Sequence, residues 1–116
     1  MNILIFAEAP EHTQLTEPIE NHHRMLFRQV SLTATSDYDQ LISLLKEDRF
    51  DLVFVAADGA RGMEGVIASK NVDSDRPVIW FSDDKNFGPQ SYRLGCRYFG
   101  TKPVTLDKLK AAFERC

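Results

Sequence analysis

Short, unbroken apolar runs separate longer stretches in which apolar and polar residues are mixed. The runs "NILIFA", "DLVFVA" and "PVIWFS" are typical of strands whose two faces are both covered, as in a parallel sheet. "QVSLTAT" alternates apolar and polar residues and predicts a strand nearer an edge, and "RYFG" predicts a short fifth strand. The predicted strands are residues 2–7, 29–35, 51–56, 77–82 and 97–100.

The segments between these runs favour helices. The polar segment after the first run predicts a helix that extends to about Phe27 and either begins near Thr16, with Pro18 in its first turn, or kinks at the proline. After the third run, "GMEG" reads as a turn, and only twelve residues separate Gly65 from Pro77. We therefore expect a shortened third helix around "VIASK".

Capping residues mark the ends of the other helices. Ser36 is a candidate N-cap for an amphipathic helix over 37–47, and Thr105 caps a last helix. A short helix around 88–94 ends at Gly95, a residue type common just past a helix C-terminus. One face of the last helix carries Leu106, Leu109, Phe113 and Cys116.

Strands that alternate with helices predict an α/β fold. We expect a five-stranded parallel sheet with helices on both faces, the doubly wound (βα)5 arrangement. In such sheets chemistry gathers where the carboxyl ends of the strands meet their loops. Acids, a hydroxyl and a lysine follow four different strands there, namely Glu8, Asp58, Ser82, Asp83 and Lys102.

Length and charge limit the class of protein. A chain of 116 residues predicts one domain over residues 1–116. The net charge of −3 gives no broad basic surface, so we expect no direct nucleic-acid binding. The apolar runs are too short to span a bilayer, and no signal peptide is recognisable, so we expect a cytoplasmic protein without membrane contact.

The cysteines and histidines suggest no metal centre. Cys96 and Cys116 form neither a metal-ligand spacing nor a disulfide framework, consistent with a reducing compartment. His12, His22 and His23 have no matched ligands at suitable spacing and are expected to be surface-helix residues.

Four segments together resemble the CheY-like receiver domain of bacterial response regulators, over essentially residues 2–116. These segments are "NILIFAEAP", "FDLVFVAADGARGMEG", "RPVIWFSD" and "GCRYFGTKPV". The 20-residue spacing from Ser82 to Lys102 is similar to receivers of the LytTR subfamily. Receivers of that subfamily precede a DNA-binding domain, so the resemblance raises the hypothesis of an output domain after residue 116 in the parent protein.

The resemblance implies phosphoryl transfer from a histidine kinase to a receiver aspartate, with Mg²⁺ held by further acids. Lys102 matches the lysine that contacts the phosphoryl group, Ser82 the hydroxyl that senses it, and Phe99 the aromatic residue behind the hydroxyl. The Lys102–Pro103 bond is expected to be cis.

The residues that would perform the transfer are missing in part. Counting from the two ends of the loop places the acceptor at Ala56 or at Ala57, and neither has a nucleophile. Asp58 lies just beyond, as a shifted acceptor or as a turn residue before a glycine. Of the acidic pair after the first strand only Glu8 remains, so Glu8 and Asp58 predict a weak or absent Mg²⁺ site.

Three interpretations follow. The first is an atypical, non-enzymatic receiver without cofactor, which regulates an output by protein contact or self-dimerisation through about residues 85–115. The second is a phosphorylatable response regulator that uses Asp58, and the third is a small nucleotide- or flavin-binding protein. The turn "AEAPEHT" argues against the third because it lacks the glycines of a phosphate cradle. In the first, we expect Lys102 to pair with Glu8 or Asp58.

Overall fold

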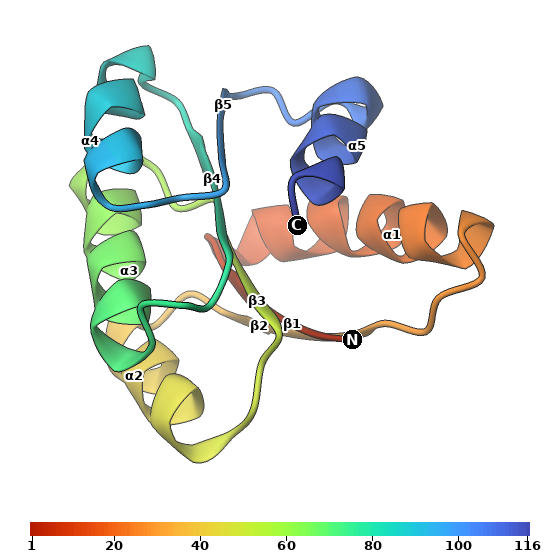
Figure 1. The fold of residues 1–116 in the computed structure, drawn as a ribbon, viewed down its shortest axis with the longest axis horizontal. Helices are drawn as coiled ribbons and strands as arrows, with labels where there is room; N and C mark the ends of the chain where they lie inside the picture. The colour runs from red at the N-terminus through yellow and green to blue at the C-terminus, as the bar shows by residue number, and fades with distance from the viewer.

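Five parallel strands form one sheet at the centre of the molecule (Figure 1). The computed structural model describes residues 1–116 and orders the strands β2-β1-β3-β4-β5. The strands are β1 (Asn2–Phe6), β2 (Ser31–Thr35), β3 (Leu52–Val55), β4 (Val78–Ser82) and β5 (Tyr98–Thr101). This order confirms the predicted doubly wound sheet and places the alternating strand β2 at an edge.

The helices cover both faces of the sheet. They are α1 (Ala9–Met25), α2 (Tyr38–Glu47), α3 (Gly59–Val72), α4 (Gly88–Arg93) and α5 (Leu106–Glu114), with the 3₁₀ turn η1 (Lys85–Phe87) before α4. Helices α1 and α5 lie on one side, and α2, α3 and α4 lie on the other (Figure 1). None of these helices has both the length and the apolar character that a bilayer span demands.

Alternate residues of the strands feed two separate cores. On the α1 and α5 side, Phe54 and Phe81 pack with Phe113 of the last helix. On the other side, Trp80 packs with residues of α2 and α3. Because both faces of β3 and β4 are fully buried, these strands read as continuous apolar runs.

Helix α1 begins earlier than the sequence suggested. It starts at Ala9, with Pro10 in its first turn, and continues past Pro18 to Met25. The expectation of a start near Thr16 was therefore wrong. Pro10 costs little where helical N–H groups have no partner, and the burial of Leu15 on the sheet favours the helix ahead of Pro18.

Helix α3 is not short, so the expectation of a shortened third helix around "VIASK" was wrong. It runs for 14 residues from Gly59, so "GMEG" belongs to the helix and is not a turn. Its glycines serve close packing: a Cβ on Gly62 would stand 2.3 Å from the carbonyl oxygen of Ala57, and one on Gly65 would stand 2.6 Å from the Phe6 ring. Glycine in this helix allows the backbone to approach the sheet.

The capping predictions were right in two cases. Thr105 accepts a hydrogen bond from the N–H of Lys108, and Gly95 takes a left-handed conformation after α4. The cap of α2 is Asp37 and not Ser36, because the Asp37 carboxylate reaches two amides of the first turn. On α5, Leu106 and Cys116 are exposed, so the buried face is narrower than expected.

Candidate functional site

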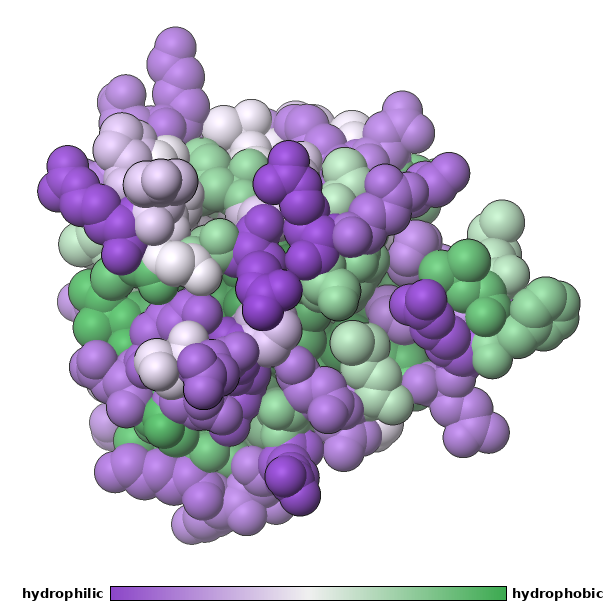
Figure 2. All heavy atoms as spheres, viewed as in Figure 1, coloured by the Kyte–Doolittle hydropathy of each residue, from purple (hydrophilic) through white to green (hydrophobic).

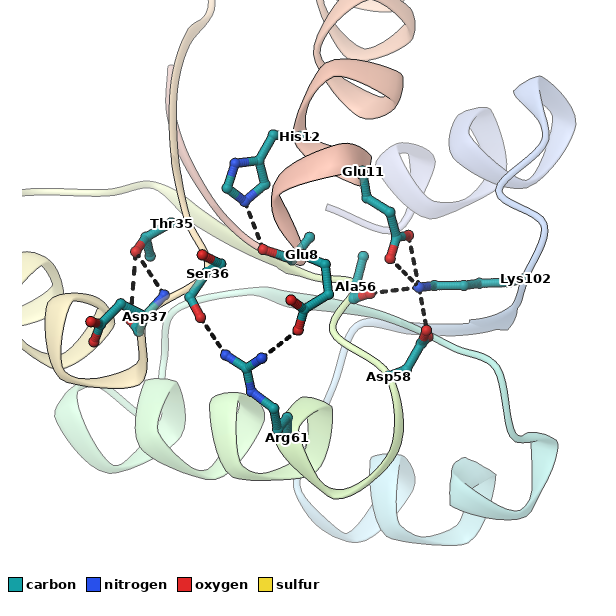
Figure 3. A network of polar contacts seen from close by, with 11 residues as sticks. Glu8, Glu11, His12, Thr35, Ser36, Asp37, Ala56, Asp58, Arg61 and Lys102 are labelled. Atoms are coloured by element: carbon teal, nitrogen blue, oxygen red, sulfur yellow. Dashed lines mark hydrogen bonds and ion pairs between the residues drawn. The ribbon is translucent and has the colours of Figure 1, made fainter.

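The ammonium group of Lys102 lies at the carboxyl ends of the strands, among oxygen atoms of three residues (Figure 3). Its Nζ is 2.8 Å from Glu11 Oε1, 2.7 Å from the carbonyl oxygen of Ala56 and 2.6 Å from Asp58 Oδ1. A lysine ammonium has three N–H donors. Each donor of Lys102 therefore has an acceptor within the protein itself.

The environment of Lys102 keeps this group charged. Its side chain is largely buried, and burial by itself lowers the pKa of the ammonium. The hydrogen bonds to Asp58 and Glu11 outweigh burial, so the pKa of Lys102 is raised above its ordinary value. The three charged groups form one ion-paired cluster in which two carboxylates face one cation.

The backbone is irregular just after β3, which explains why counting from the two ends of the loop gave two different positions for the phosphoryl acceptor. The amide groups of Ala56 and Ala57 both donate to the carbonyl oxygen of Phe6, at 2.8 and 3.1 Å. Two residues of one strand thus oppose one residue of its neighbour, as in a β-bulge. Ala56 faces the α1 and α5 core, and Ala57 faces the opposite core.

Asp58 is placed beside the lysine by this bulge. It stands at the N-cap position of α3, but its carboxylate makes no capping hydrogen bond. Asp83, at the end of β4, performs that role by accepting from the N–H of Gly59 at 3.1 Å. The Asp58 side chain remains 48% exposed and is therefore reachable from solvent as well as from Lys102.

A second cation, Arg61, forms an ion pair with Glu8, the acid that follows β1. One guanidinium nitrogen bonds Glu8, and another bonds the carbonyl oxygen of Ser36 (Figure 3). The guanidinium group also lies 5.7 Å from the centre of the Phe6 ring. Arg61 comes from the first turns of α3, and Glu8 precedes α1. The arginine thus links the loops after β1, β2 and β3.

The residues present do not fit a magnesium site. Mg²⁺ requires carboxylate oxygens free to coordinate it. Here Glu8 is paired with Arg61, while Glu11 and Asp58 are paired with Lys102. No group of three or more acidic, histidine or cysteine side chains is arranged to hold a metal.

Ser82 and Phe99 lie near the site but are engaged elsewhere. The buried Ser82 hydroxyl accepts a hydrogen bond from the N–H of Asp84 at 3.1 Å. The Phe99 ring lies edge-on to Trp80, with 5.3 Å between ring centres, and close to Gly88. The expected cis peptide is present at Lys102–Pro103.

The structure brings together only part of the predicted set. Lys102 meets Asp58 as expected, whereas Glu8 belongs to a separate ion pair. Sequence reasoning missed Glu11 and Arg61. A signal for Glu11 was available, because a residue three positions after Glu8 on a helix starting at Ala9 lies near the same face.

Comparison with known proteins finds the same fold among solved structures only. No protein-family model matches the chain, and no curated protein matches its sequence. A protein described as a CpaE2 pilus assembly protein from Sinorhizobium meliloti superposes with a TM-score of 0.76 at 20% identity, covering 100% of this chain and 99% of the other.

Two response regulators are also similar. HP1043, an orphan response regulator of H. pylori, has a TM-score of 0.74 at 20% identity, covering 98% of this chain and 93% of its own. TrrA from Thermotoga maritima, in complex with Mg²⁺ and BeF, has a TM-score of 0.74 at 14% identity. The match covers 98% of this chain and 96% of TrrA. The chain therefore has the CheY-like receiver fold.

Proposed function

We propose that this chain is an atypical receiver module that acts by protein–protein contact and does not depend on a phosphoryl group. The observation that carries the proposal is the state of Lys102, whose three N–H donors are all bound to oxygens of the protein. An incoming phosphoryl oxygen would have to displace one of these acceptors. The residues at the end of β3, Ala56 and Ala57, have no side chain that could carry it.

The ion pairs also account for how the loops stay in place without a phosphate. Arg61 joins the loop before α1 to the loop before α2, and Lys102 joins α1 to the end of β3. These contacts hold the strand ends in one arrangement. The domain would then present a constant surface to its partner instead of a surface that switches.

The output of such a module is a bound partner and not a chemical product. We propose that the chain has no catalytic activity of its own and that it regulates transcription or another output through its partner. Tyr92 on α4 is 88% exposed and lies in the 85–115 surface that the sequence suggested for contact. An exposed tyrosine is a residue type enriched at protein interfaces.

A second candidate function is favoured by one observation. Asp58 lies 2.6 Å from Lys102 and has an exposed carboxylate, as a phosphoryl acceptor requires. In that reaction an Asp58 oxygen would attack the phosphorus of a kinase phosphohistidine, the P–N bond would break, and histidine would leave. The paired states of Glu8 and Glu11 argue against it, because they leave no free carboxylates for Mg²⁺.

Incubation with acetyl phosphate and Mg²⁺, followed by intact-mass measurement, distinguishes the two functions. We expect no mass change, with a receiver that has an aspartate at the end of its third strand as the positive control. A stoichiometric gain of one phosphoryl group that is lost in Asp58→Asn but kept in Asp75→Asn would establish the second function. Asp75 is an exposed acid of the loop before β4 and serves as the matched control.

A further inference from the structure

The C-terminal end of α1 exposes three consecutive apolar residues. Met25 is 81% exposed, Leu26 is 48% exposed and Phe27 is 99% exposed. They form part of the apolar projection on the right of the space-filling view, where α1 ends in Figure 1 (Figure 2). A contiguous exposed apolar patch of this kind indicates a contact surface.

Phe27 is unfavourable in its position within the monomer. The N–H of Arg28 bonds the carbonyl oxygen of His23, and the N–H of Phe27 bonds that of Arg24, which is the hydrogen-bond pattern of a Schellman helix end. Phe27 occupies the left-handed residue of this motif, with a φ of 56°, where glycine is usual. Neither the backbone nor any packing of its fully exposed ring favours phenylalanine here.

A groove that could receive an aromatic ring lies beside this projection. It runs between α1 and α5 with a volume of about 720 Å³. Its lining includes Pro18, His22 and Met25 of α1, and Leu106 and Leu109 of α5. Leu106 is 70% exposed, so the groove has an apolar wall that nothing in the monomer covers.

We propose that this groove binds Phe27 of a second copy of the chain, in a twofold dimer whose two α1 helices run antiparallel. A twofold contact uses the same patch on both subunits, so it must contain both the projection and its receptor. The α1 surface satisfies this requirement, because Met25 both flanks Phe27 and lines the groove.

The charges of α1 are complementary to those of a second, antiparallel copy. Glu17 lines the groove, and the exposed Arg24 and Arg28 lie at the C-terminal end of the helix. Antiparallel helices bring the acidic side of one copy against the basic end of the other, whereas parallel helices would align like charges. This self-complementarity favours a second copy of the chain over an unrelated protein as the partner.

The surface that this dimer would bury is formed by α1 and α5. Helix α1 has 17 residues and is about 25 Å long, and α5 extends the patch sideways. A standard interface buries about 800 Å² on each partner, and smaller contacts are typical of weak, reversible association. The dimer goes beyond the proposed function and is independent of phosphorylation, because the groove includes none of the residues that bind Lys102.

Sedimentation velocity over a concentration series of the full chain tests the proposal. We expect the wild-type chain to pass from monomer to dimer with rising concentration, and Phe27→Gly to weaken the dimer about tenfold or more. Glycine suits the left-handed position, so this variant should melt at the same temperature or higher, which excludes unfolding as the cause. Tyr38→Ser, which removes another exposed aromatic side chain, on α2 and away from the groove, is the matched control and should dimerise as the wild type does.

Charge reversal adds a second test of the antiparallel geometry. Glu17→Arg and Arg24→Glu should each weaken the dimer, and the double variant should recover much of the lost affinity. The proposal is overturned if the wild type stays monomeric throughout, if Phe27→Gly dimerises like the wild type, or if Tyr38→Ser loses as much dimer affinity as Phe27→Gly. It is also overturned if the double charge variant is no stronger than the two single variants.

Discussion

Lys102 donates a hydrogen bond of 2.7 Å to the main-chain carbonyl oxygen of Ala56. Ala56 is one of the two alanines that fall at the phosphoryl-acceptor position of the receiver pattern. Lys102 bonds to its backbone there because alanine offers no side-chain oxygen. Glu11 and Asp58 supply the negative charge that an alanine cannot supply. The lysine can therefore remain buried although no acid occupies the end of β3, because both its charge and its donors are satisfied.

The first prediction concerns the stability that this cluster provides. Lys102→Met removes the cation and leaves the carboxylates of Glu11 and Asp58 near one another without it. We expect the free energy of unfolding to fall by roughly 1–3 kcal/mol, as for the loss of hydrogen bonds to charged groups. Urea denaturation measures this loss, and Lys46→Met, at an exposed position on α2, is the control. Equal stability of the two variants would contradict the cluster's role.

The second prediction concerns magnesium. With Glu8 paired to Arg61 and Asp58 paired to Lys102, we expect no saturable change in Trp80 fluorescence or in melting temperature at millimolar Mg²⁺. Arg61→Ala releases Glu8 and should produce a larger response than the wild type gives. Saturation of the wild-type signal well below a millimolar would contradict this expectation and support the phosphorylatable alternative.

The third prediction concerns the close approach of α3 to the sheet. A Cβ at Gly62 would meet the Ala57 carbonyl oxygen at 2.3 Å and Trp80 Nε1 at 3.0 Å, and the backbone atom cannot rotate away. Gly62→Ala should therefore destabilise the fold by about 1–3 kcal/mol or more. Gly59→Ala is the matched control, because a Cβ at Gly59 would meet open space. Thermal unfolding should show a smaller loss there, caused only by the positive φ of 61°.

The fourth prediction concerns pH. Burial, followed by the charge of His23, lowers the pKa of His22 below its ordinary value of 6.5, and Arg28 and Lys110 act in the same direction while Glu114 opposes them. The unfolded chain thus binds this proton more tightly than the folded chain. Stability should be fully present above about pH 6.5 and should fall as the pH drops below it.

The variant His22→Gln measures this contribution. It should reduce the loss of melting temperature between pH 7.5 and about 5.5 relative to the wild type, at a concentration where the chain is monomeric. The same slope in both proteins would show that the fall in stability with pH arises at other groups.

Local patterns predicted the parts of the fold that depend on neighbours in the chain. Unbroken apolar runs marked β1, β3 and β4 because burial on both faces demands apolar residues at consecutive positions, and alternation marked the edge strand β2. Thr105 and Gly95 marked helix ends because their conformations and hydrogen bonds involve only adjacent residues. Helix α3 was misread because Gly62 and Gly65 serve contacts with distant residues, which no local pattern records.

The sequence by itself determined which segments form strands, the presence of the Lys102–Pro103 pair and the lack of a carboxylate at Ala56 and Ala57. Only the tertiary structure decided which acid meets which cation. Lys102 and Glu11 are 91 residues apart, and Arg61 and Glu8 are 53 residues apart. Such pairs form because the parallel sheet brings the ends of its strands and the starts of its helices to one edge, where long charged side chains reach between elements that the sequence separates.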